Sequence, residues 1–166
     1  MDEVPWLNAD EERAWRSYRR MRTLLDLHLA RDLLSDSGLS EADYDVLSTL
    51  SERTGGEWRP SELAARLLWS TSRLAHHVGR MERRGLITRG SCPDDKRGAA
   101  VALTHEGWQA LRQAAPEHVR SVRRHLVDLL TPAEIDALAV ISSKVIDHFA
   151  DAVAQDRLTS GTSSHP

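Results

Sequence analysis

Apolar positions recur at helical spacing along most of the chain and predict several α-helices. The first is expected to begin after Asn8, which can form a capping box with Glu11 three residues on. A second is expected after Ser40. Two further helices, within "RPSELAARLLWSTSRLAHHVGRMERRG", are separated by a short turn; Ser70 can cap the second of them and Gly85 can end it. This last helix carries one narrow apolar stripe, formed by Leu74, Val78 and Met81.

The pattern changes after this helix. "LITRGSC" and "AAVALT" predict two short strands joined by a charged loop with Pro and Gly. Thr104 can cap a long helix that Pro116 should kink or divide. Thr131, Pro132 and Glu134 signal the start of a last helix. A helix, a turn, a second helix and a hairpin in this order predict a winged helix-turn-helix.

The expected fold is therefore mainly α, of the α+β class. The terminal helices are apolar on more than one side, so they need packing partners on more than one side. The expected parts are an N-terminal helix over 1–36, a winged helix-turn-helix lobe over 37–104, C-terminal helices over 105–156 and a disordered tail over 157–166.

Charge is unevenly distributed along the chain. Residues 59–97 contain nine bases and four acids, a net charge of +5, whereas the remainder carries −8 and brings the total to −3. A basic segment inside an acidic protein attracts phosphate while limiting indiscriminate association. Charge alone leaves a solvated basic surface as an equal alternative.

The second helix of the predicted pair has a polar outer face suited to the major groove. At about 100° per residue, the side opposite Leu74 is basic and free of acids. Arginine can offer two donors to guanine, and the first residues of the helix should enter the groove most deeply. The expected major-groove residues are Thr71, Ser72, Arg73, His76, His77 and Arg80. The expected phosphate contacts are Arg59, Ser70, Arg83 and Arg84.

The charged hairpin beside this helix is suited to the adjacent minor groove, whose negative potential favours an inserted arginine. Arg97 is the expected inserted residue. Asp95, two residues earlier, can hold its guanidinium by a charge-assisted hydrogen bond, and Lys96 is expected at the DNA backbone. An ordinary polar turn is the alternative.

The stretch from "SELA" through "RMERRGLI", the "DDKR" hairpin and "LTHEG" resembles the MarR family of bacterial winged-helix transcription regulators. The spacing of Asp95 and Arg97 matches the family's wing pattern. The resemblance implies a homodimer in which the first helix and the last two interlock, and hence dimerisation roles for residues 1–36 and 105–156. A dimer with two recognition helices about 34–36 Å apart would read a palindromic duplex. Repression by blocking polymerase is the simplest role, although activation is an alternative.

The resemblance also implies a crevice for a small aromatic or anionic effector between the dimer lobe and the DNA lobe. Candidate lining residues are Trp15, Arg22, His28, Tyr44 and Trp69. Cys92, the single cysteine, lies just before the wing; a passive role is favoured over redox sensing, although Arg89 could lower its pKa.

Other classes of function have little support. The sequence has no zinc-ligand spacing, phosphate loop or nucleophile elbow, so neither a metal, a cofactor nor catalysis is expected. No apolar run nears the roughly 20 residues of a membrane span, and the acidic start differs from a signal peptide, so a cytoplasmic location is expected. The alternative to a DNA-binding regulator is a helical protein-interaction module with a basic face.

Overall fold

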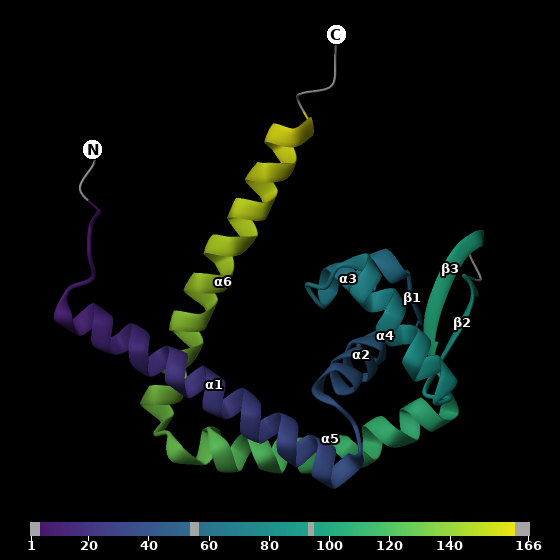
Figure 1. Cartoon of the computed structure of the whole chain (residues 1–166), viewed down its shortest axis with the longest axis horizontal. Helices are drawn as coiled ribbons and strands as arrows, with labels where there is room; N and C mark the ends of the chain where they lie inside the picture. The colour runs from purple at the N-terminus through teal and green to yellow at the C-terminus, as the bar shows by residue number, and fades with distance from the viewer. Residues whose placement is uncertain (1–3, 54–56, 93–94, 162–166) are drawn as a thin grey trace. The chain divides into compact units, whose positions relative to one another are not determined.

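A computed structural model describes the backbone of residues 4–53, 57–92 and 95–161, and the side chains of that set outside 91–99 and 151–161. The elements are α1 (Ala9–Ser37), α2 (Glu41–Ser51), β1 (Glu57–Trp58), α3 (Pro60–Arg66), α4 (Thr71–Arg83), β2 (Ile87–Cys92), β3 (Asp95–Leu103), α5 (His105–His125), the 3₁₀ turn η1 (Val127–Leu129) and α6 (Pro132–Gly161) (Figure 1). They divide into two compact units, Met1–His125 and Leu126–Pro166.

The predicted helix starts are confirmed by their hydrogen bonds. The Asn8 side chain accepts from the N–H groups of Asp10 and Glu11, and Glu11 accepts from the Asn8 N–H, which completes a capping box. Ser40 forms the same box with Asp43 at the start of α2. Ser70 caps α4 through the Arg73 N–H. These local bonds satisfy amide groups that would otherwise lack a helical partner.

A three-stranded antiparallel sheet follows α4, in the order β1-β3-β2. Ile87 pairs with Leu103 and Arg89 with Val101 along the two long strands. The sequence did not predict β1, which pairs Trp58 with Val101 and contains only two residues. Of the two outcomes expected at Pro116, a kink or a division of the long helix, division does not occur, because α5 continues through this residue.

The core of the first unit lies between α2, α3, α4 and the sheet. Leu47 and Leu50 of α2, Leu63 of α3 and Met81 of α4 are fully buried, and Val101 of β3 is 1% exposed. Burying each such side chain contributes about 1.5–3 kcal/mol. The core therefore fixes the inward face of α4 and leaves its other face to solvent.

Helix α1 lies against α5 in the same unit (Figure 1). The carboxylate of Asp32 joins the two helices. Asp32 Oδ2 accepts from Ser121 Oγ at 2.6 Å, Arg124 Nη2 at 2.7 Å and His125 Nε2 at 2.9 Å. Hydrogen bonds from Ser121 and His125, with the charge of Arg124, hold the pKa of Asp32 far below its usual value. The partners lie about 90 residues away in sequence, and nothing in the local pattern identified them.

The second unit consists of η1 and α6. Thr131 and Glu134 form the predicted start of α6: Glu134 accepts from the Thr131 N–H and hydroxyl. The helix continues through 157–161, which the sequence assigned to a disordered tail, and 162–166 lie outside the described residues. Among the described residues, no helix has the length and hydropathy of a membrane span.

Candidate nucleic-acid interface

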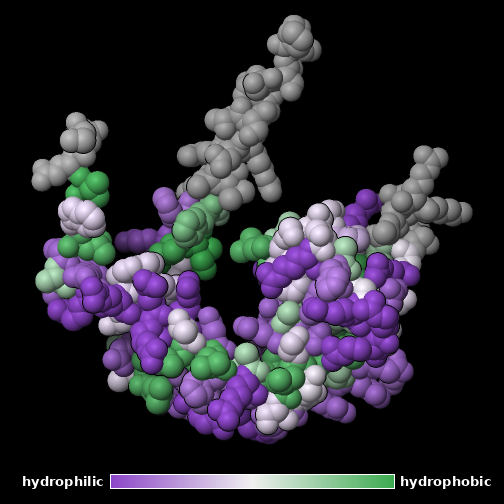
Figure 2. Space-filling view, viewed as in Figure 1, coloured by the Kyte–Doolittle hydropathy of each residue, from purple (hydrophilic) through white to green (hydrophobic). Residues whose placement is uncertain are grey.

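Helix α4 presents a polar face to solvent. Leu74, Val78 and Met81 are at most 2% exposed and face the core, as the apolar stripe predicted. The side chains on the opposite side are exposed, namely Thr71, Ser72, Arg73, His76, Arg80 and Arg83. On the face shown in Figure 2, hydrophilic residues cover most of this lobe. The exposed set can meet base edges and phosphates, whereas the buried stripe cannot.

The prediction that His77 is a major-groove residue is wrong, because this histidine is buried. Its side chain is 5% exposed and lies on the inner side of α4. Nδ1 is 2.7 Å from Arg80 Nη2, and Nε2 is 3.1 Å from Asp43 Oδ1, although the latter pair lacks hydrogen-bond geometry. The imidazole therefore lies in the interior of the lobe and cannot contact a base directly.

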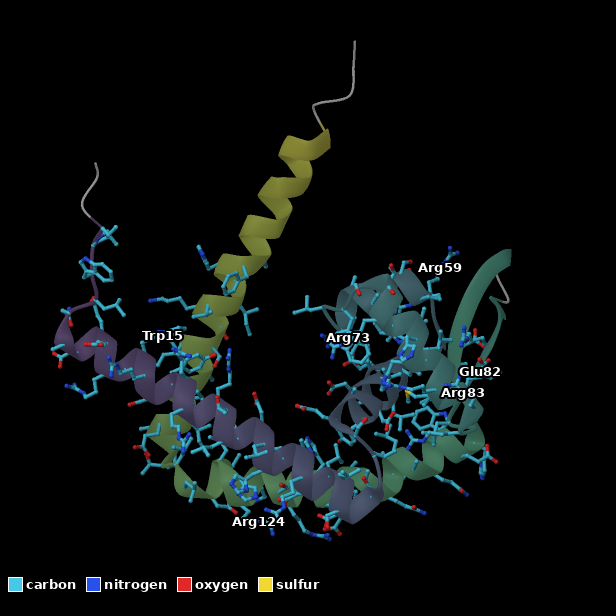
Figure 3. The ribbon with its side chains drawn as sticks, in the orientation of Figure 1. Trp15, Arg59, Arg73, Glu82, Arg83 and Arg124 are labelled. Carbon is cyan, nitrogen blue, oxygen red and sulfur yellow. The ribbon has the colours of Figure 1, made fainter. Side chains whose placement is uncertain are left out.

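Arg73 is held at the start of α4 by an aromatic ring. Its guanidinium carbon lies 4.2 Å from the centroid of the Trp69 ring, a cation–π arrangement. Trp69 is half-buried, packs against the core and meets the His77 ring edge-on at 5.4 Å. The sequence assigned Trp69 to an effector crevice, but in the structure this ring supports Arg73. Contact with the ring restricts the Arg73 side chain, which remains exposed at the start of α4 (Figure 3).

A buried carboxylate joins α2 to the end of α4. Asp43 is 4% exposed; it completes the cap of α2 and accepts from Arg84 Nη1 at 2.7 Å. Burial favours the neutral acid, but hydrogen bonds from Arg84 and Ser40 outweigh it, so the pKa of Asp43 lies below its usual value. Arg84, a predicted phosphate contact, therefore anchors the end of α4 to α2. Its side chain remains 45% exposed.

The remaining predicted phosphate contacts lie at the edges of the same lobe. Arg59 is the N-cap residue of α3, and Arg83 lies in the last turn of α4; both are exposed (Figure 3). Ser70 uses its hydroxyl as the cap of α4. The two arginines place positive charge at the edges of the exposed face of α4.

Antiparallel β2 and β3 form the predicted wing, whose base is tied to α4. Arg89 of β2 pairs with Glu82 of α4 at 3.0 Å. Gly79 permits this crossing, because a Cβ there would lie 3.0 Å from Arg89 Nη2. The backbone of Asp95, Lys96 and Arg97 belongs to β3, but their side chains lie outside the described residues, as does that of Cys92. Their proposed roles stay predictions.

The five candidates for an effector crevice are not brought together among the described side chains. Trp15 stacks on Tyr18 at 5.9 Å near the start of α1, and Arg22 is exposed further along. His28 lies beside His125, with ring centroids 5.2 Å apart. Tyr44 packs against His118 of α5, with ring centroids 4.5 Å apart and planes inclined by 41°, and Trp69 supports Arg73 as described. The described residues also hold no cluster of three potential metal ligands.

This geometry defines a winged helix-turn-helix lobe attached to long helices, and comparisons with known proteins agree with it. The MarR family model matches residues 37–98. A MarR family regulator from Streptomyces coelicolor, Sco3205, solved with DNA, is 41% identical, with 89% of this chain and 92% of that chain covered and a TM-score of 0.83. AbsC from the same organism is 38% identical, with 89% and 99% coverage and a TM-score of 0.84.

Curated relatives give the same result. The regulator YkoM of Bacillus subtilis is 30% identical over 85% of this chain and 92% of its own length. The regulator PecS of Dickeya dadantii is 29% identical over 79% and 76% respectively. The chain belongs to the MarR family of transcriptional regulators.

Proposed function

We propose that this protein binds a palindromic DNA duplex as a homodimer and represses transcription there. The observation that carries the proposal is the exposed face of α4, which is polar, contains three arginines and no acid, and sits on a buried core. Its first turn is capped by Ser70 and carries Thr71, Ser72 and Arg73, the positions of a recognition helix that reach base edges. The wing is expected to place Arg97 in the adjacent minor groove.

The homodimer is supported by exposed apolar side chains on the terminal helices, each considered within its own unit. Trp15, Tyr18 and Leu27 of α1 are 48–60% exposed. On α6, five large apolar residues are at least half exposed: Val140, Ile141, Val145, Ile146 and Phe149. Figure 2 shows hydrophobic surface on the part of α6 that is not grey. Monomeric proteins rarely expose so much apolar surface, and where they do it usually marks a site of interaction with another molecule. A second copy of the chain would supply partners for both helices.

Release by a small aromatic effector is supported by one detail of the α2–α5 contact. His118 Nδ1 is buried without a hydrogen-bond partner among the described residues, and the His118 ring lies against Tyr44 at an interplanar angle of 41°. Burial lowers the pKa of His118, so the neutral ring keeps a buried nitrogen whose hydrogen bond a hydroxyl group entering between α2 and α5 would supply. Phenol should therefore weaken duplex binding by the wild type, and Tyr44→Ala should reduce this effect. Equal release of both proteins would contradict the site.

The DNA-binding proposal is tested by two arginine substitutions on a duplex selected from a random pool. Arg73→Ala should relax preference at one base pair by about 1–3 kcal/mol, as expected for loss of a bidentate contact. Arg97→Ala should weaken binding without unfolding the chain. Arg120→Ala is the charge-matched control, because Arg120 is exposed on α5 and pairs with Glu117 outside the winged lobe.

The outcomes separate the roles. A uniform loss for Arg73→Ala on all sequences would indicate a phosphate contact and contradict base reading. Affinity should also fall steeply with salt, because phosphate contacts release counterions. If the wild type showed no preference among duplexes, the alternative of a protein-interaction module would replace a DNA-binding regulator.

A further inference from the structure

A buried histidine contacts an exposed arginine of the recognition helix. His77 Nδ1 lies 2.7 Å from Arg80 Nη2. Arginine has donors and no acceptor, so Nδ1 must be the unprotonated nitrogen of this pair. The imidazole proton is therefore assigned to Nε2, which faces Asp43 Oδ1 at 3.1 Å. A proton directed toward a carboxylate is electrostatically favourable even without ideal hydrogen-bond geometry.

The surroundings hold this imidazole in place. Trp69 meets its ring at 86°, and the other oxygen of Asp43 is occupied by Arg84. The charged groups that face His77 are Asp43 and Asp45 from α2, and Arg80 and Arg84 from the end of α4. Burial lowers the pKa of His77, which maintains the neutral ring that Arg80 needs as an acceptor.

Arg80 is at the edge of the outer face of α4. It follows Leu74 by six residues, which places it about 60° from the direction opposite the buried stripe. Its side chain is exposed, so without His77 it would sample many rotamers and lose that freedom on binding. The hydrogen bond to a rigid buried ring removes much of this freedom in advance.

We propose that His77 is a positioning residue for DNA recognition, which holds the Arg80 guanidinium through Nδ1 in the orientation that contacts the duplex. This inference rests on the proposed DNA-binding function. His77 itself cannot reach the DNA, so it would affect the affinity for the duplex only through Arg80. The same geometry makes Asp43 an indirect contributor, because Asp43 faces the proton on Nε2 and thus favours the tautomer with a free Nδ1.

Two substitutions at this position test the acceptor. In His77→Asn the amide oxygen can occupy the place of Nδ1 and accept from Arg80, whereas His77→Leu fills similar space without an acceptor. His77→Leu should weaken binding to the selected duplex by about 2- to 10-fold, the range for immobilising one long side chain. His77→Asn should stay within about 2-fold of wild type, because it restores the acceptor.

A double-mutant cycle separates positioning from a structural effect. In an Arg80→Ala background, His77→Leu and His77→Asn should have equal affinities, because the residue through which His77 acts is absent. An equal loss from His77→Leu in both backgrounds would overturn the proposal. A wild type that binds no duplex would overturn the proposed function as well, so the two failures are distinguishable.

The wild-type protein offers a second measurement that needs no substitution at His77. Nitrogen NMR of the imidazole should show the proton on Nε2 and an unprotonated Nδ1 near neutral pH. Arg80→Ala should shift the Nδ1 resonance more than the Nε2 resonance, since Nδ1 loses its donor. A proton on Nδ1 in the wild type would overturn the proposal even if the His77 variants failed to fold.

Discussion

Replacing Gly107 by alanine should destabilise the winged lobe at the junction of α5 with the wing. Gly107 is buried in the first turn of α5, where a Cβ would lie only 2.0 Å from the Leu86 carbonyl oxygen. That oxygen already accepts from the Thr104 N–H at 3.2 Å. Thr104 also donates its hydroxyl to Gly85 O at 2.6 Å and accepts from the Gly107 N–H at 3.0 Å. The "LTHEG" sequence thus joins α5 to the end of α4.

The magnitude follows from the size of the displacement. A Cβ contact needs at least about 3 Å, so the Leu86 backbone must move by about 1 Å and carry buried Ile87 with it. Overpacking of this kind costs about 3 kcal/mol, and disturbing the Thr104 bond adds about 1 kcal/mol. Alanine recovers about 1 kcal/mol of helix propensity. The expected net loss in free energy of unfolding is therefore about 3 kcal/mol.

Urea unfolding followed by tryptophan fluorescence, at one fixed protomer concentration, measures this loss. Gly90→Ala is the matched control, because a Cβ at Gly90 meets no atom of the described side chains and backbone within 4 Å; its effect should be within about 0.5 kcal/mol. A loss below about 1 kcal/mol for Gly107→Ala, or a gain, would refute the argument that this contact excludes a Cβ.

Three further results are expected. Leu68 lies in the turn between α3 and α4 with φ of 55° and is 92% exposed. Because this left-handed backbone conformation favours glycine, Leu68→Gly should raise the free energy of unfolding by up to about 1 kcal/mol, and the β-branched Leu68→Ile should lower it. Urea titration measures both changes. Burial lowers the pKa of His77 and His118, so the unfolded chain binds more protons than the folded one, and the melting temperature should fall as pH drops below about 6.5. His77→Asn should make the melting temperature less dependent on pH in this range. An unchanged dependence would exclude His77 as its source. The lowered pKa of Asp32 contributes stability above its unfolded value that is lost as pH falls, so Asp32→Asn should reduce the melting temperature more at pH 7 than at pH 3; equal reductions would contradict the pairing.

Much of the fold could be predicted because its signals are local. Asn8, Ser40 and Ser70 each stand within three residues of the amide groups that they cap. The apolar stripe of α4 identified its buried face from spacing alone. The sequence could not decide between a kink and a division at Pro116; α5, which packs against α1, α2 and β3, continues through it. Strand β1 was missed because two residues are too few to show alternation.

The candidate site was less predictable because its polar contacts join distant segments. His77 is polar, yet it lies only 60° from Leu74 on a helical wheel, and its partner Asp43 is 34 residues earlier on another helix. Asp43 could be recognised as a first-turn acid but not as the partner of Arg84, 41 residues away. Trp69 was a candidate from the sequence only as part of an effector crevice, whereas its contact with Arg73 depends on the geometry of the turn.

Selection of bound fragments from random duplex, followed by footprinting, tests the central claim that the exposed face of α4 and the wing read DNA together. The account predicts an enriched palindrome whose half-sites are centred about 10 base pairs apart, with protection of the major groove in each half-site and of the flanking minor groove. A pool that shows no enrichment, or a protected site without two-fold symmetry, would contradict it.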